Sequence, residues 1–360
     1  NYYSRDGQPY ENTAVVLKRL ETVVERAPHH TGATHLYIHA TEEHYPQKAE
    51  AAADSLQHAA PSAGHLVHMP SHIYMRLGRY EDAYEGNRLA VAADESYITQ
   101  CRQQGIYPLS YYPHNVHFLM WAAERLGRSE QALFQARKVA KQAHDHMAGM
   151  DFALYDSFYV MPLHMMVRFG MWDDILAEPA PEETAPYVRG TWHYARARAL
   201  TNTGELREAA SEIRTLDDIR ENGDFGAMTV GFADPKRLLT IASNVASGEL
   251  AAHRGRYDNA IALLDEAARI EDGLMYNEPP DWPTPGRHML GKVLLDADRP
   301  QDAEIVYWAD LKKNPDNGYA LYGLWQCLTA QERADEAAAI KARFDAAWSQ
   351  ADTELQSSSF

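Results

Sequence analysis

Cysteine is scarce in this chain of 360 residues, where Cys101 and Cys327 are the two that occur, far apart in the sequence. A disulfide framework and a CxxC metal knuckle are therefore excluded, and the redox compartment stays open. Basic residues are outnumbered as well, with 34 Lys and Arg against 51 Asp and Glu and a formal net charge of −17. Because so acidic a surface repels phosphate backbones, we expect no nucleic-acid partner.

Long apolar runs are also missing, and no stretch approaches the roughly eighteen apolar residues of a membrane span. The sequence contains no basic-then-apolar signal peptide and opens on Asn1 instead of methionine, so we expect a processed or partial product. No run of five or more residues alternates as a strand would. HExxH, a phosphate loop, a nucleophile elbow and a dinucleotide fingerprint are absent. The composition, 45% hydrophobic and 24% charged, is that of a folded polypeptide.

What is present is a repeat, in which an apolar helical stretch leads through a turn to a small residue that opens a second helix. Three of the spacings between successive copies equal 34 residues, and the others are longer by an insertion. The copies end at Ala49, Ala83, Ala132, Ile175, Ala209, Ala260, Ala303 and Ala337. Glycine in most of these turns suits the left-handed conformation that ends a helix.

This pattern resembles the tetratricopeptide repeat over about residues 12–348, in about eight units. The resemblance implies an all-α fold, a right-handed α-solenoid superhelix of about eight helix pairs with an open concave groove. We divide the chain into a histidine-rich half (1–187), a C-terminal half continuous with it (188–348) and a tail (349–360).

Histidine is distributed unevenly, since thirteen of the seventeen lie between His29 and His146. Three fall in "HLVHMPSHIYMRLGRY" (65–80), and the intervals 65/68/72 and 114/117 place their side chains on one helix face. His35 and His39 form another such pair. A helical solenoid needs no histidine for its packing, so this asymmetry indicates a functional site.

The resemblance also implies which side chains line the groove, because the first helix of each repeat faces it. On that register the groove carries His65, His68, His72, His114, His117, His164, Arg76, Trp121, Arg125 and Arg168. The strings "HHTGATHLYIHATE" (29–42), "HLVHMPSHIYMRLGRYEDAYEGNRLAVAAD" (65–94) and "YYPHNVHF" (111–118) are further similar to a bacterial subfamily of tetratricopeptide-repeat proteins. That similarity implies a histidine-rich groove and an exported, periplasmic location, with a cytoplasmic one left open.

The first functional hypothesis is a metalloprotein in which groove histidines hold a transition metal ion, copper or iron before zinc, and extends to a metal-dependent oxidative step. A carboxylate from Glu42 or Glu43 could join the ligands. The alternative hypotheses are a scaffold that binds a peptide or partner protein in its groove without metal, and a metal-free enzyme with His72 or His117 as general base. The candidate metal ligands are His35, His39, His65, His68, His72, His114, His117 and His164.

Other groove residues are candidates for binding a small molecule or peptide. Arg76, Arg125 and Arg168 occupy the same repeat position and could hold a carboxylate or phosphate, or pair with neighbouring acids such as Glu124. Trp121, Tyr111 and Tyr112 complete this set, the tyrosines as a lid or as packing. Pro70 interrupts the helix between His68 and His72, which bends the chain and either aims both rings at one point or changes the superhelix curvature. The substrate, the oligomeric state and the question of enzymatic activity stay open.

Overall fold

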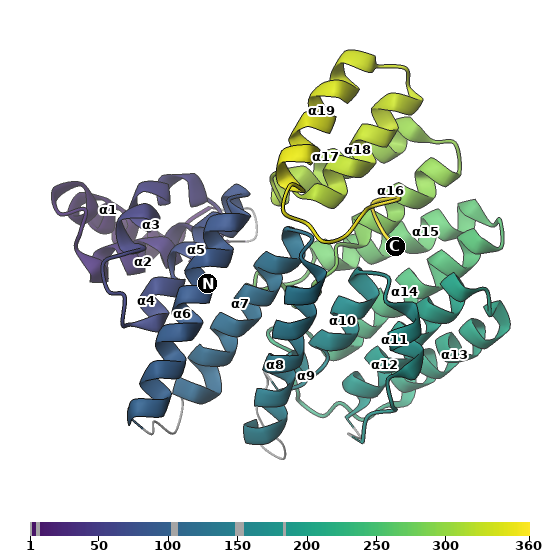
Figure 1. Ribbon diagram of the computed structural model, residues 1–360, viewed down its shortest axis with the longest axis horizontal. Helices are drawn as coiled ribbons and strands as arrows, with labels where there is room; N and C mark the ends of the chain where they lie inside the picture. The colour runs from purple at the N-terminus through teal and green to yellow at the C-terminus, as the bar shows by residue number, and fades with distance from the viewer. Residues whose placement is uncertain (1, 5–7, 102–106, 148–154, 183–184) are drawn as a thin grey trace. The chain divides into compact units, whose positions relative to one another are not determined.

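The computed structural model describes the chain except residues 1, 5–7, 102–106, 148–154 and 183–184 (Figure 1). The regular elements formed by the described residues are helices, and the pairing of extended backbone among these residues is confined to the isolated bridges Tyr3–Pro9 and Val230–Ala233. The all-α prediction is confirmed. None of the helices described is both long and apolar enough to cross a membrane.

The chain folds as two compact units, residues 1–123 (unit 1) and 124–360 (unit 2). The boundary falls inside helix α7, at a different place from the division at 187/188, which stays a prediction. Unit 1 contains α1 (Glu11–Arg26), α2 (Thr31–Thr41), η1 (Pro46–Lys48), α3 (Glu50–Leu56), α4 (Gly64–His68), α5 (Pro70–Leu77), α6 (Tyr80–Cys101), η2 (Tyr107–Tyr111) and most of α7 (Tyr112–Arg125).

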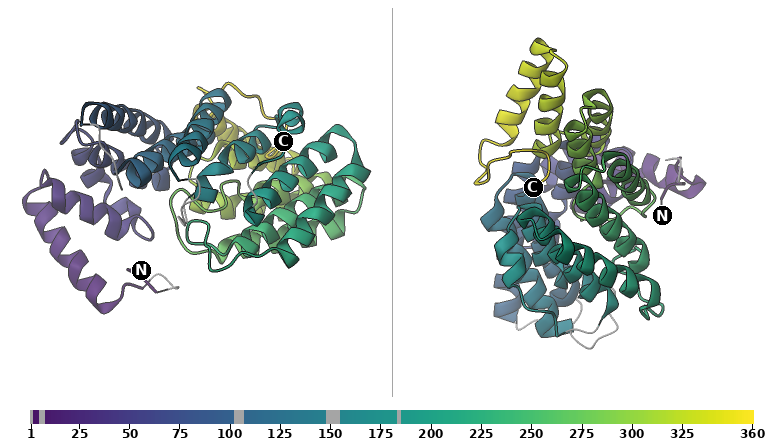
Figure 2. Two further views of the ribbon diagram at one scale, coloured as in Figure 1. Left: turned by 90° about the horizontal axis from the view of Figure 1, so that it is seen from below. Right: turned by 90° about the vertical axis from the view of Figure 1, so that its right-hand side faces the viewer.

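Unit 2 is a regular stack of helix pairs (Figures 1 and 2). Consecutive helices pack as α12 with α13, α14 with α15, α16 with α17 and α18 with α19, and the first helices α12, α14, α16 and α18 also contact one another in series. This packing is that of a TPR-like solenoid. Its helices are α8 (Ser129–Met147), α9 (Tyr155–Tyr159), α10 (Met161–Arg168), α11 (Trp172–Ala177), α12 (Pro186–Thr203), α13 (Leu206–Asn222), α14 (Pro235–His253), α15 (Tyr257–Asp272), α16 (Gly286–Asp296), α17 (Pro300–Lys313), α18 (Gly318–Ala330) and α19 (Ala334–Ala347).

The recurring small residue of each repeat lies where the sequence predicts it. Ala49 directly precedes α3, and each of the others is the fourth residue of the second helix of its pair. All are alanine, which allows close packing of the two helices, except Ile175. Almost all of these residues are fully buried, namely Ala49, Ala83, Ala132, Ile175, Ala209, Ala260 and Ala303, and Ala337 is 6% exposed.

The turn inside each pair is left-handed. Five positions before the buried small residue stand Gly78, Gly127, Gly170, Gly204, Gly255, Asp298 and Glu332, all with positive φ. The next amide bonds back across the turn, from Arg79 N to Tyr74 O (2.9 Å) and from Arg333 N to Leu328 O (3.0 Å). This is the usual hydrogen bond of a glycine-ended helix. The last two repeats make it without glycine.

The segment after α19 is not helical, but it packs against unit 2 (Figure 1). Ser358 is fully buried and donates its hydroxyl to His288 O at 2.8 Å. Arg198 Nη2 donates to Phe360 O at 3.0 Å, and Gln326 Nε2 donates to Gln356 O at 3.3 Å. The predicted tail is therefore an ordered part of this unit, attached to α12, α16 and α18.

Candidate metal centre

Four helices of unit 1 bring histidines together. His35 and His39 lie one turn apart on α2, His65 and His68 on α4, and His72 on α5, while His114 lies on α7. Between α4 and α5 the backbone of Met69 keeps helical dihedral angles, with φ −49° and ψ −40°, although Pro70 begins a new helix. The helix is interrupted at Pro70 because proline has no amide hydrogen to donate. The rings of His68 and His72, on either side of it, nevertheless stay in contact.

The most buried group of histidines is His68, His72 and His114. Each offers a ring nitrogen, and these three atoms all lie within 4.8 Å of one another. His68 Nε2 lies 3.0 Å from His72 Nε2, and His68 is 0% and His72 5% exposed. All three rings contact the Phe118 ring, with centroid distances of 4.6 Å from His68, 4.7 Å from His72 and 4.9 Å from His114. An apolar ring thus covers one side of this group.

The tautomer of His68 follows from its neighbour on α6. Asn87 Nδ2 donates to Ala83 O at 2.7 Å and to Ser71 Oγ at 2.9 Å, so the other amide atom, Oδ1, faces His68 Nδ1 at 2.7 Å. Oδ1 only accepts, and His68 Nδ1 must therefore carry the hydrogen. In the neutral ring, Nε2 then holds a lone pair directed at His72.

Glu42 favours one tautomer of His72, as Asn87 does for His68. Its Oε2 atom lies 3.3 Å from His72 Nδ1, and the carboxylate is 13% exposed. A carboxylate beside Nδ1 favours the hydrogen on that atom, which leaves His72 Nε2 as a second lone pair. Two such lone pairs 3.0 Å apart repel unless a proton or a cation lies between them. Burial disfavours the protonated form of His68, whose pKa is held well below its usual value, mainly by desolvation and then by His72 and His114.

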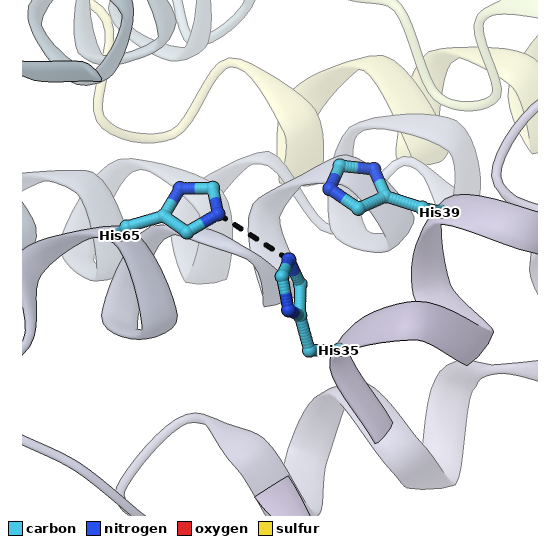
Figure 3. A group of neighbouring side chains, drawn as sticks. All are labelled: His35, His39 and His65. Carbon is cyan, nitrogen blue, oxygen red and sulfur yellow. Dashed lines mark hydrogen bonds between the residues drawn. The ribbon is translucent and has the colours of Figure 1, made fainter. Parts of the chain in front are cut away.

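A second group, His35, His39 and His65, is partly exposed and meets the same 4.8 Å criterion. His65 Nε2 lies 3.3 Å from His35 Nε2, and Figure 3 shows one ring nitrogen of His39 turned toward the other two rings. Burial, with smaller contributions from His35, His39 and His72, lowers the pKa of His65 to about 4. The pKa of His35 is also lowered, mainly by burial. Neutral rings are the form that binds metal ions.

A third group, His39, Glu42 and His72, connects the first two. Glu42 Oε2 is 3.3 Å from His39 Nδ1 as well as from His72 Nδ1. The Glu42 carboxylate thus contacts one histidine of each group and joins the six histidines of unit 1 into one cluster.

The structure places the two remaining candidate ligands elsewhere. His117 is buried on α7, three residues from His114, but none of the three groups formed by the described residues contains it. His164 lies on α10 of unit 2, where its ring is 5.3 Å from Trp282 and 6.2 Å from Tyr194. Burial lowers its pKa to about 4. Their assignment as ligands stays a prediction.

The arginines on the predicted groove positions are engaged by protein groups. In unit 2, Arg125 Nη1 and Arg168 Nε donate to the two oxygens of Glu124, at 2.8 Å and 2.5 Å, and all three side chains are almost fully buried. Arg168 also stacks on the Tyr319 ring at 3.3 Å. In unit 1, Arg76 Nη2 donates to Glu43 O at 3.3 Å. The pairing with Glu124, one of the two alternatives drawn from the sequence, is present.

The aromatic candidates lie around the histidines of unit 1. Tyr111 is 40% exposed, with its edge 4.8 Å from His65, and Trp121 is buried, 5.5 Å from Phe118. Tyr112 donates its hydroxyl to Glu95 Oε1 at 2.9 Å, so it packs on α6.

Two functional residues of α6 had no assigned role in the sequence interpretation, although both stand in the string 65–94. Asn87 orients His68, as described above. Asp94 accepts from Asn115 Nδ2 at 2.7 Å and from the Tyr107 hydroxyl at 2.6 Å. Burial raises the pKa of Asp94 above its usual value. Because Asn115 follows His114, α6 contacts the chain beside candidate ligands on both α4 and α7. Both residues could have been found from the sequence, because each is a polar residue on the face of α6 that is expected to be buried.

Comparison with known proteins adds no family. No family model matches the chain, and no curated protein matches it. Solved structures that resemble it include a Rap protein complexed with competence and sporulation factor, at 11% identity and a TM-score of 0.42, with 95% of this chain and 99% of that one covered. Yeast Tom70 matches at 11% identity and a TM-score of 0.30, covering 95% and 93%. An assembly chaperone of RpL4 (Acl4, residues 1–338) matches at 14% identity and a TM-score of 0.29, covering 92% and 99%.

The fold and the candidate site together define a TPR-like helical repeat protein with a continuous histidine cluster in its first unit.

Proposed function

We propose that unit 1 is a metal-binding module that holds a transition metal ion through His68, His72 and His114. The observation that carries this proposal is the 3.0 Å separation of His68 Nε2 and His72 Nε2, with Asn87 and Glu42 beside the Nδ1 atoms of the two rings. Two imidazole nitrogens on one ion, each about 2.0–2.1 Å from it, lie roughly 2.9–3.4 Å apart when the angle at the ion is between a right angle and a tetrahedral one. The observed separation fits that range.

The groups around His68 and His72 also favour metal binding over simple packing of the rings. His68 has at Nδ1 the outer hydrogen bond, to Asn87, that orients a metal-bound imidazole, and His72 Nδ1 lies 3.3 Å from the Glu42 carboxylate. Glu42 also supplies negative charge beside a divalent ion, which three neutral imidazoles cannot do. Three protein ligands leave at least one position for water or a substrate.

Imidazole ligands suit copper, iron, nickel and zinc, and among divalent ions copper binds nitrogen ligands most tightly. This order places copper before zinc, and we place iron before zinc as the other redox-active ion that imidazole ligands bind. A bound copper or iron ion would supply redox chemistry at that free position, and the metal-dependent oxidative step is part of this proposal. The role of the protein would be to exclude water on the Phe118 side and to keep the rings neutral.

Elemental analysis tests the proposal. The purified chain is compared with His68→Ala/His72→Ala and with the control His58→Ala, which changes an exposed histidine of the same unit. All three proteins are first matched for helicity by circular dichroism. We expect bound copper or iron in the parent and in the control and little in the double variant. Negligible metal in the parent, after reconstitution as well, would reject the proposal.

A second candidate function belongs to unit 2, which we propose binds an extended segment of a partner protein. It is supported by the non-helical segment 349–360, which already packs on first helices α12, α16 and α18. Arg198 and Gln326 donate to its backbone, and its Ser358 hydroxyl donates to His288 O. Main-chain recognition of this kind accepts segments of varied sequence.

A chain ending at Ser349 and a labelled peptide of residues 350–360 would test this second function. Saturable binding to the shortened chain, and none to the parent, is expected. Equal binding to both, or to neither while the shortened chain keeps its helicity, would reject it.

A further inference from the structure

We propose that unit 1 binds two metal ions and not one, with His35, His39 and His65 as the second set of ligands and Glu42 between one histidine of each set, His39 and His72. This inference rests on the proposed function, because it takes the group His68, His72 and His114 as the first site. It adds a site that the sequence reasoning, which treated the histidines as one cluster, does not separate.

The second set has the composition and spacing of a separate site. Its three ligand atoms lie within 4.8 Å of one another, a limit that the first set also meets, and the two sets share no residue. The rings of His35 and His39 are 5.0 Å apart and those of His35 and His65 are 5.1 Å apart, measured between centroids. As Figure 3 shows, the three rings come from two helical segments and surround one space. Three imidazoles form a complete set for a copper, iron or zinc ion.

Glu42 connects the two sets. Its Oε2 atom lies 3.3 Å from Nδ1 of His39, in the second set, and 3.3 Å from Nδ1 of His72, in the first. The two rings lie 5.4 Å apart. Two divalent ions repel each other, and a carboxylate between their ligands reduces that repulsion. The same carboxylate favours the hydrogen on Nδ1 of both rings, which leaves both Nε2 atoms for metal.

The two sites differ in their outer partners, so their affinities should differ. His68 has Asn87 beside Nδ1, whereas His65 Nδ1 is buried and has no hydrogen-bond partner among the described residues. The first set is more buried than the second, which has Tyr111, 40% exposed, at its edge. Because outer hydrogen bonds change metal affinity about 10–100-fold, the first set is expected to fill first.

The experiment is a titration of Cu(II) into the chelator-stripped full chain, followed by equilibrium dialysis and by electron paramagnetic resonance of the bound copper. The variants are His35→Ala, which changes the second set alone, and His114→Ala, which changes the first set alone. His58→Ala is the matched control, and circular dichroism verifies that each variant keeps the helicity of the parent. His35→Gln repeats the first test with a smaller change in volume.

We expect two equivalents of copper in the parent and in His58→Ala, bound in two steps, and one equivalent in His35→Ala and in His114→Ala. The paramagnetic signal per copper should fall as the second equivalent binds, because neighbouring Cu(II) ions couple.

One equivalent in the parent, lost from both variants, would overturn the second site and leave the proposed function standing, with a single ion near His39, Glu42 and His72. Two equivalents retained in His35→Ala and His35→Gln would also overturn it, since the second ion would then lie elsewhere. No copper in the parent would overturn this inference and the proposed function together.

Discussion

His68 Nε2 and His72 Nε2 lie 3.0 Å apart in unit 1, and each ring has an acceptor at its other nitrogen: Asn87 Oδ1 at 2.7 Å and Glu42 Oε2 at 3.3 Å. One turn of helix separates the two histidines in sequence, but their outer partners come from α6 and from the end of α2. The arrangement brings two ring nitrogens face to face in a buried site, which is the geometry that the proposed metal ion requires.

The outer hydrogen bond at His68 should set metal affinity. We expect Asn87→Ala to weaken metal binding about 10–100-fold, because the ring loses the acceptor that fixes its tautomer. Asn87→Asp keeps an acceptor at that atom and should bind within a few-fold of the parent. Competition with a chromogenic chelator measures both. Equal affinity in the alanine variant and the parent would show that Asn87 does not orient the ligand.

Acid should destabilise the metal-free chain. The pKa of His65 is lowered to about 4, and those of His68 and His114 lie well below their usual value, in each case mainly through burial. Between about pH 6.5, the unfolded value, and pH 4 the unfolded chain binds protons that the folded chain does not. The free energy of unfolding should therefore fall as the pH is lowered through this window.

Urea unfolding of the chelator-treated chain at pH 7.5 and pH 5 measures this effect. His68→Gln removes one of these groups and should show a smaller loss between the two pH values. An equal loss in the variant and the parent would mean that His68 contributes nothing to it.

Glu124 should be essential to unit 2. Arg125 and Arg168 both donate to its carboxylate, and the three groups are almost completely buried. Removing one partner of a buried ion pair costs about 3–5 kcal/mol, because the remaining charge is uncompensated. We expect Glu124→Gln to lower the unfolding free energy by this amount. The exposed Glu130→Gln is the control, and a loss below about 1 kcal/mol in Glu124→Gln would instead favour arginines available to a ligand.

The two turns without glycine offer a stabilising change. Glu332 has φ 57° at the position where five other repeats place glycine. A residue with a Cβ atom destabilises the folded state by about 1–2 kcal/mol in this left-handed conformation. Glycine avoids that strain, but it also makes the unfolded chain more flexible, which cancels part of the gain. We expect Glu332→Gly to raise the free energy of unfolding by up to about 1 kcal/mol, as measured in urea. Glu332→Ala keeps the Cβ atom and should bring no gain.

Asp352 caps a distant helix. Its two carboxylate oxygens accept from the amides of Ser129 and Glu130, at 2.7 Å and 3.2 Å, at the start of α8. Desolvation raises its pKa, but the hydrogen bonds from Ser129 and Glu130 outweigh that effect and lower it. Asp352→Ala should cost about 1 kcal/mol near pH 7, typical of a lost N-cap.

Since the folded pKa of Asp352 is the lower one, its contribution is present above about pH 4 and disappears as the pH falls through the folded pKa. The difference between the parent and Asp352→Ala should therefore vanish in strong acid, whereas the control Glu354→Gln should differ little at any pH. A difference that persists in strong acid would point to lost packing in place of lost capping.

Much of the fold follows from local sequence. The repeated spacing of a glycine five residues before a small residue predicts where each first helix ends and where the second helix packs closely. Gly78, in a left-handed turn, and the buried Ala83 show both in the structure. Such features can be predicted because the turn and the helices beside it are formed by neighbouring residues. Asp298 and Glu332 adopt the same turn without glycine, so the packing of the pair overrides local preference there.

The histidine site could be predicted only in part. Spacing along a helix places His68 and His72 on one face, and His114 and His117 on another, but it does not say which rings meet. Packing of α5 against α7 side chains brings His114 to His72 and leaves His117 out of the three groups.

By itself, the sequence determined that this chain is an all-α repeat and that its histidines gather in the first third. The tertiary structure decided that His35, His39 and His65 form one set and His68, His72 and His114 another, that Asn87 and Glu42 orient the rings, and that Glu124 pairs with two arginines. The physical reason is distance. These contacts join side chains from different helices, and their geometry depends on how the helices pack and not on the interval between residues.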